Sequence, residues 1–396
     1  MKFIENIFKN LDPHFEKGGK WEKFFYIYEA HRTLFLVPED TTGATGAQIR
    51  DGIDMKRMMM TVIISMLPCL LFGIWNAGHQ HFWATGEVAT MGEKLLQGAI
   101  LVVPIIAVSY MVGLGIEFTF ATIRRHEVNE GFLVTGMLIP LVMPATVPLW
   151  QVGLATAFAV ILGKEVFGGT GMNILNVALT ARAFLYFAYP SQISGDVWTY
   201  LGDAHAVEGF SGATPLAIGA LAVEGTQSMV SQLNAHWADG MFSFQNMFLG
   251  IMPGSIGETS TLMCLIGAAI LIMTGVGSWK IIFSVFGGAY AMAFLCNVVG
   301  ANEYMLLPAH YHLVIGGLAF GAVFMASDPV TAAQTESGKW IYGFLIGVLT
   351  IIIRVFNPAY PEGIMLAILL MNVFAPLIDY YVVAANKKRR LKRATV

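Results

Sequence analysis

The sequence predicts an all-α integral membrane protein with ten transmembrane helices arranged as two inverted five-helix repeats. The first observation behind this prediction is composition. Of the 396 residues, 56% are hydrophobic and only 12% are charged, whereas soluble domains carry about 25% charged residues. The second is a series of apolar stretches of membrane-spanning length, and the third is a weak internal repeat. The nearly balanced net charge of -3 argues against a nucleic-acid-binding protein, which would show a basic stripe.

Ten apolar segments are long enough to cross a bilayer or to form part of a crossing. Their approximate limits are 57–77, 95–123, 132–147, 150–167, 174–189, 258–277, 279–299, 312–326, 340–356 and 363–384. The third and eighth are short, and the third contains Pro140 and Pro144. We therefore expect both to be discontinuous helices that line an interior site, where neighbouring helices shield broken backbone from lipid.

Lysine and arginine are distributed unevenly, which predicts the orientation of the chain. With both termini in the cytoplasm, 20 of the 23 lie on the cytoplasmic side, and only Lys94 and Arg354 lie outside. Arg182 falls within the fifth segment, and the loop 190–257 has no basic residue, so we expect that loop outside. The predicted organisation is an N-terminal segment 1–56 with an amphipathic helix, repeats 57–189 and 258–384 around the loop 190–257, and a basic tail 385–396.

A weak internal repeat relates the third and fourth segments to the eighth and ninth. At an offset of 181 the matching pairs are Gly136 and Gly317, Val142 and Val323, Ala145 and Ala326, and Pro148 and Pro329. After an insertion the offset becomes 190, and Lys164 matches Arg354. Five helices per repeat would give the two halves opposite orientations, as in transporters with a site at the repeat interface. Chance similarity between glycine-rich helices is the alternative, and a urea-transporter-like channel would show the same repeat.

The outside loop contains Ser211-Gly-Ala-Thr214, a turn of small residues that presents a hydroxyl group. The pattern alone is compatible with an ordinary loop. It is similar to flavinylation sequences, in which a threonine hydroxyl is joined to the phosphate of FMN by a phosphoester bond. The three cysteines lie in apolar runs without the spacing of a zinc or iron–sulfur site. An electron carrier in this chain would therefore be organic.

Further motifs extend this similarity along nearly the whole chain. They are Arg125-His-Glu-Val-Asn-Glu-Gly131, Gly163-Lys-Glu-Val-Phe-Gly-Gly-Thr-Gly171, Phe187-Ala-Tyr-Pro-Ser-Gln-Ile-Ser-Gly-Asp196, Ile251-Met-Pro-Gly-Ser-Ile-Gly-Glu-Thr259 and Asn357-Pro-Ala-Tyr-Pro-Glu-Gly363. Their order and spacing resemble the B subunits of bacterial sodium-translocating NADH:quinone oxidoreductases and their relatives, the D subunits of Rnf-type complexes. The N-terminal extension favours the quinone-reducing family.

The resemblance implies a redox subunit of the bacterial inner membrane that carries FMN covalently on Thr214 and riboflavin noncovalently. Electrons would pass through them to ubiquinone, coupled to sodium export. The implied partners are an NADH-oxidising FAD/iron–sulfur subunit, a second FMN-bearing subunit and small membrane subunits. A D subunit of a ferredoxin:NAD complex of the Rnf type, or a channel, are the alternatives.

Several polar residues are candidates for holding the flavins. Ser211 and Gly212 precede Thr214, and the turn from Gly254 and Ser255 opens the sixth segment on the same side. Free N–H groups at a helix start attract phosphate, although a simple capped turn explains the pattern equally well. Asn173 and Asn176 are expected on one helix face, where two amides could bind riboflavin or instead join helices. Arg182 is expected to pair with a carboxylate or carbonyl, with the flavin phosphate as a further candidate.

Candidates for sodium and quinone binding lie toward the cytoplasmic side. Glu117, Asp328 and Asp379 are expected at similar depth and offer the oxygen ligands that a hard cation requires, although each alone could be a capping or interfacial acid. Gly113 and Gly115 would give a thin helix surface for a flat quinone ring, or simply allow close helix packing. Trp21 and Phe24 belong to an aromatic N-terminal stretch, expected to form an interfacial helix or the mouth of the quinone site.

Overall fold

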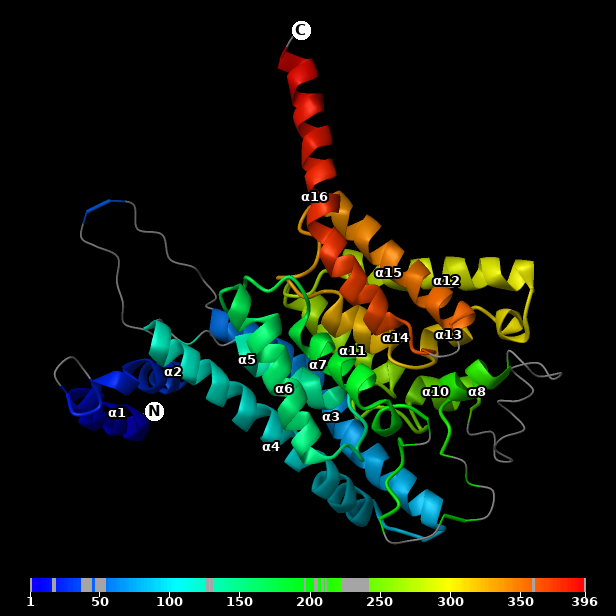
Figure 1. Cartoon of the computed structure of the whole chain (residues 1–396), viewed down its shortest axis with the longest axis horizontal. Coiled ribbons are helices and arrows are strands. Elements are labelled where there is room, and N and C mark those ends of the chain that lie inside the picture. The colour runs from blue at the N-terminus through cyan, green and yellow to red at the C-terminus, as the bar shows by residue number, and fades with distance from the viewer. Residues whose placement is uncertain are drawn as a thin grey trace.

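The computed structural model describes most of the chain. The described residues are 2–15, 19–36, 45–46, 55–125, 128, 131–195, 197–202, 206–207, 210, 212–222, 242–357 and 360–394. Regular structure within these ranges is entirely helical. The prediction of an all-α chain is confirmed for these residues, and Figure 1 shows most of the helices gathered into one bundle, with α1 (Lys2–Phe15) and α2 (Phe25–Phe35) at its side.

Among the described residues, six helical stretches are long and apolar enough to cross a membrane. They are α3 (Met55–Thr85), α4 (Met91–Arg124), α6 with the short helix η2 (Leu149–Phe167), α12 (Trp279–Val299), α15 (Glu336–Phe356) and α16 (Ile364–Ala394). Three shorter apolar helices complete the bundle. These are α5 (Gly131–Leu141), α7 (Val177–Ala188) and α11 (Thr261–Met273).

The segment predicted at 312–326 is broken between α13 (Tyr311–Val314) and α14 (Leu318–Phe320), and α14 continues directly into a π-helical turn, η5 (Gly321–Met325). The segment predicted at 132–147 is also interrupted, because α5 ends at Leu141 and α6 starts only at Leu149. Both breaks leave carbonyl groups that need partners from elsewhere in the chain, and these partners define the sites described below.

Smaller helices surround the bundle. They are α1 (Lys2–Phe15), η1 (Glu22–Phe24), α2 (Phe25–Phe35), η3 (Pro190–Gln192), α8 (Pro215–Ala222), α10 (Phe244–Leu249) and η4 (Glu303–Leu306). The helices α1 and α2 form a hairpin in which the Phe15 and Tyr28 rings stack 4.4 Å apart. The hairpin lies against α4, where the His31 and Phe118 ring centroids are 5.8 Å apart.

Helix contacts follow the same order in the two halves of the bundle. In the first half α4 packs on α6 and α6 on α7, and in the second α12 packs on α15 and α15 on α16. The halves meet where α3 contacts α11 and α7 contacts α16. Small residues permit close approach: a Cβ atom on Gly98 of α4 would lie 1.7 Å from the Ile74 carbonyl oxygen of α3. The final helix α16 extends far beyond the bundle (Figure 1).

Candidate functional site

Thr214 borders a cavity of about 690 Å³, called here the Thr214 cavity. Its wall combines α7, the start of α8, the turn before α11, the break between α13 and α14, and the loop before α16. The polar residues that line it are Arg182, Thr214, Ser255, Glu258, Thr259, Tyr360 and Glu362, beside Gly254 and Trp198. Thr214, Gly254, Ser255 and Arg182, four residues selected from the sequence, therefore share one cavity.

Thr214 lies directly before α8, and its Oγ1 accepts a hydrogen bond of 3.2 Å from the Ala217 N–H. The hydroxyl oxygen is thus located at the positive end of an eight-residue helix, where a phosphate group is stabilised. Gly212 has a φ of 64°, a left-handed conformation that glycine adopts without strain. Ser211 lies outside the described residues.

Arg182 is the centre of the polar wall and is only 2% exposed. Its Nη1 donates to Ser255 Oγ at 3.0 Å, to Glu258 Oε2 at 2.9 Å and to the Val142 carbonyl. Its Nη2 donates to Glu362 Oε2 at 2.7 Å. The guanidinium therefore satisfies the carbonyl left free where α5 ends and joins two carboxylates. The expectation that Arg182 pairs with a carboxylate or a carbonyl agrees with this geometry.

Arg354 holds the second broken segment in a comparable way. It donates to the carbonyl oxygens of His312 at 2.7 Å, Ile315 at 2.9 Å and Glu362 at 3.1 Å. The side chain is completely buried. The sequence counted Arg354 among the basic residues on the outer side of the membrane, and the structure adds that its side chain binds the backbone carbonyls at the break between α13 and α14.

Three buried polar atoms that line the Thr214 cavity have no hydrogen-bond partner among the described residues. They are Arg182 Nε, Thr259 Oγ1 and the Tyr360 hydroxyl. Leaving such groups unpaired costs about 1–3 kcal/mol each. Together they form a wall of hydrogen-bond donors, which fits a bound molecule with several acceptor oxygens or nitrogens.

Four polar residues of the cavity were given no role on the basis of the sequence, although all of them lie in the motifs quoted above. They are Glu258, Thr259, Tyr360 and Glu362. Burial raises the pKa of Glu362 to about 7, against the opposing effect of Arg182. The nearby negative charge of Glu258, which shares the Arg182 guanidinium, raises the pKa of Glu362 further, so Glu362 takes up a proton more easily than a free glutamate does.

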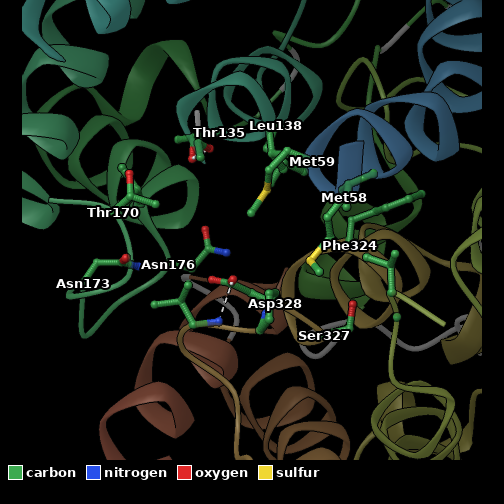
Figure 2. Close-up of a pocket in the computed structure, with 18 of the residues that line it drawn as sticks. Met58, Met59, Thr135, Leu138, Thr170, Asn173, Asn176, Phe324, Ser327 and Asp328 are labelled. Carbon is green, nitrogen blue, oxygen red and sulfur yellow. Dashed lines mark hydrogen bonds between the residues drawn. The ribbon is translucent and has the colours of Figure 1, made fainter. Parts of the chain in front are cut away.

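A second cavity of about 840 Å³, called here the Asp328 cavity, lies at the start of α7, whereas the Thr214 cavity borders a later part of the same helix. Figure 2 shows Asn176 and Asp328 pointing into it, with Asn173 at its edge and Met58, Met59 and Phe324 opposite. The helix α7 connects the two cavities, because Val177 lines this one and Arg182 the other. Val177 and Arg182 are five residues apart on α7, which corresponds to a rise of about 8 Å along the helix axis.

Asn173 and Asn176 both line the Asp328 cavity, but they do not share a helix face as expected. The helix α7 begins only at Val177, and Asn176 is its N-cap residue, whose side chain accepts from the Leu179 N–H at 3.1 Å. Asn173 donates to the Leu175 carbonyl at 3.0 Å. An N-cap residue adopts a non-helical conformation, so the helix cannot extend back to residue 173.

The three candidate sodium ligands do not converge. Glu117 forms a buried ion pair with Lys164. Asp328 accepts from the Val330 N–H and the Thr331 hydroxyl, while Asp379 accepts from the N–H groups of Gln334 and Thr335 at 2.7 and 2.9 Å. The described part of the chain contains no group of three histidine, cysteine or acidic side chains that could hold a metal ion. Only Asp328 lines a cavity described here.

The candidate quinone residues are also separated. Gly113 faces the protein, where a Cβ atom would lie 1.8 Å from the Phe132 ring, whereas nothing lies within 4 Å of a Cβ on Gly115. Gly113 therefore permits close packing, and Gly115 opens onto the outer surface of α4. Trp21 and Phe24 are 45% and 51% exposed in the N-terminal hairpin.

Comparison with known proteins gives matches along almost the entire chain. The model of the NQR2, RnfD, RnfE family matches residues 42–388. The B subunit of the Na(+)-translocating NADH-quinone reductase from Chromohalobacter salexigens is 49% identical, covering 98% of this chain and 96% of its own. Proteins of the same name from Ectopseudomonas mendocina and Stutzerimonas stutzeri are each 47% identical, covering 98% of this chain and 99% of their own.

Proposed function

The chain belongs to the NQR2, RnfD, RnfE family, and we propose that it is the B subunit of a sodium-translocating NADH:quinone reductase. The observation that supports this most strongly is the Thr214 cavity, where a helix-capping threonine, an arginine and three unpaired buried polar groups face one space. Nearly full-length similarity to relatives named as B subunits of such reductases supports the same function.

In this proposal the Thr214 cavity holds FMN, joined through its phosphate to Thr214 Oγ1. The start of α8 would stabilise the phosphate, with Gly212 and Ser211 before it and the turn of Gly254 and Ser255 facing it. Arg182, Thr259 and Tyr360 would bind the ring system through their free donors. The Asp328 cavity would hold riboflavin, with the amides of Asn173 and Asn176 hydrogen-bonded to the uncharged ring.

Flavins in these two cavities would supply the one-electron carriers that the amino-acid side chains lack. The protein itself would hold the two flavins at different positions along α7 and would exclude water from the space between them. Ubiquinone would bind near Gly115 on α4, close to the hairpin with Trp21 and Phe24. Asp328 is the best placed of the sodium candidates, because it alone faces a cavity described here. Glu117 and Asp379 would contribute to sodium binding only indirectly, through Lys164 and through the backbone of Gln334 and Thr335.

The proposed arrangement in the membrane is ten helices in two inverted repeats, with both termini in the cytoplasm of the bacterial cell and Thr214 on the periplasmic side of the inner membrane. Matching contacts in the two halves support the repeat, as do the broken third and eighth segments. The basic residues at the end of α16 support the orientation. The partners would be the NADH-oxidising FAD/iron–sulfur subunit, a second FMN-bearing subunit and small membrane subunits.

The test is replacement of Thr214. A Thr214→Val variant should lose the flavin fluorescence of this subunit on a denaturing gel, and the wild-type peptide containing Thr214 should carry the added mass of FMN. Thr214→Ser, which keeps a hydroxyl group, is the matched control. Fluorescence retained by the valine variant would refute the assignment to Thr214, whereas absence of covalent flavin from the wild-type protein would favour the urea-transporter-like channel. Quinone reduction by the purified complex distinguishes the proposal from an Rnf-type D subunit.

A further inference from the structure

Four buried charged side chains from both halves of the bundle meet beside the Thr214 cavity. They are Arg182 on α7, Arg354 on α15, Glu258 in the turn before α11 and Glu362 in the loop before α16. The side chains of Arg182, Glu258 and Glu362 are 2%, 6% and 14% exposed, and Arg354 is fully buried. With all four ionised their charges sum to zero, so removal of one leaves an uncompensated charge in a region of weak screening.

Glu362 is the residue that connects the two arginines. Its carboxylate accepts from Arg182 at 2.7 Å, and its backbone carbonyl accepts from Arg354 Nε at 3.1 Å. Glu362 therefore ties the end of α5, held by Arg182, to the break between α13 and α14, held by Arg354. It also lines the Thr214 cavity, whereas Arg354 does not.

The two ends of the cavity favour different parts of a bound flavin. The start of α8 at Thr214 attracts a phosphate, whereas Glu258 and Glu362 repel one. The wall around Arg182 instead offers free donors from Arg182 Nε, Thr259 and Tyr360, which fit the carbonyl groups of an uncharged ring. The ring would thus lie beside the four charges, where a nearby charge tunes its electronic properties.

We propose that Glu362 is a positioning residue for the flavin of the Thr214 cavity: it fixes the Arg182 guanidinium against the cavity and balances the buried charges, and thereby sets the flavin's midpoint potential. The proposal rests on the proposed covalent FMN at Thr214. Each electron delivered to the cavity adds one negative charge there. Reduction is therefore easier when the surrounding groups sum to +1 than when they sum to zero.

The experiment compares Glu362→Gln with wild type in the complete purified complex at pH 8, where Glu362 is ionised. Potentiometric titration followed by visible absorption gives the midpoint potentials, and the component lost in Thr214→Val identifies this flavin. We expect Glu362→Gln to keep covalent flavin fluorescence and to shift the midpoint upward. Glu362→Asp should restore the wild-type value. Glu336→Gln is the matched control, because Glu336 is an exposed acid at the opposite end of α15, paired with Lys280 and Lys339.

An unchanged midpoint in a Glu362→Gln complex that keeps its flavin would overturn the proposal, as would an equal shift in Glu336→Gln. If the glutamine variant does not assemble, Glu258→Gln removes the other negative charge and must give the same upward shift. Absence of covalent flavin from the wild-type protein is a different result, since it refutes the assignment of Thr214 rather than the role of Glu362.

Discussion

Glu117 and Lys164 form an ion pair that joins α4 to the turn after α6, with side-chain exposures of 5% and 4%. Breaking a buried pair by removing one partner leaves an uncompensated charge and costs about 3–5 kcal/mol, whereas replacing both partners by apolar residues of similar size is much less harmful. We expect Lys164→Met to lower the thermal unfolding temperature of the purified complex strongly, and Glu117→Leu combined with Lys164→Met to recover most of the loss. A sodium KM that rises in Glu117→Gln without a drop in thermal stability would instead indicate direct sodium binding by Glu117.

The two glycines of α4 give a matched pair of variants. Gly113→Ala places a methyl group against the Phe132 ring and should destabilise the protein by about 1–3 kcal/mol, the typical cost of overpacking. Gly115→Ala has open space around it, so its stability should stay near that of wild type. If quinone binds on this face, Gly115→Ala should raise the KM for ubiquinone. Thermal unfolding and steady-state kinetics separate the two effects, and an unaltered KM would remove Gly115 from the quinone site.

The asparagines of the Asp328 cavity can be tested separately because only one of them caps a helix. Asn173→Ala should lower the riboflavin that can be extracted from the complex while leaving the unfolding temperature unchanged. Asn176→Ala should lower both, because loss of an N-cap costs about 0.5–2 kcal/mol. Asn176→Ser keeps a capping oxygen and is the control for the stability effect. Normal riboflavin content in the double alanine variant would contradict the proposed binding site.

The raised pKa of Glu362 predicts a pH dependence of stability. Its folded-state pKa of about 7 lies above the usual value for an unfolded glutamate, about 4.3, so the folded protein holds a proton that the unfolded chain has already lost. The resulting stabilisation is fully present below the unfolded pKa and is lost as the pH rises through 7. Glu362→Gln cannot lose this proton. Between pH 5 and 8, the unfolding temperature of Glu362→Gln should rise relative to that of wild type as the pH increases. A difference between the two unfolding temperatures that does not change with pH would exclude this titration.

The sequence predicted the all-helical character of the chain because apolar length and composition are local properties. The positions of Pro140 and Pro144 predicted an interrupted third segment, and α5 ends at Leu141. The start of α7 was predicted too early, because the apolar pattern does not reveal that Asn176 uses its side chain to cap the helix.

The candidate site was predicted only in part, because its contacts join distant parts of the chain. The sequence selected Thr214 by motif similarity, Ser255 as part of a turn that opens a helix and Arg182 as a charge within a span, and all three line one cavity. The partners of Arg182 lie 76 and 180 residues away, beyond the reach of spacing arguments. The partners of Arg354 could not be predicted for the same reason, because two of its carbonyl partners lie about 40 residues earlier in the chain.

The last helix has a mechanical consequence for the basic C-terminus. Ala375 is the final buried residue of α16, yet the helix continues without interruption to Ala394. Asp379 still contacts the loop before α15, so the 15 residues after it form an arm of about 22 Å, and the helix sets the direction of the basic end as well as its distance. Inserting one residue between 380 and 385 would turn that end by about 100° around the helix axis, while inserting seven would nearly restore its direction and only lengthen the arm.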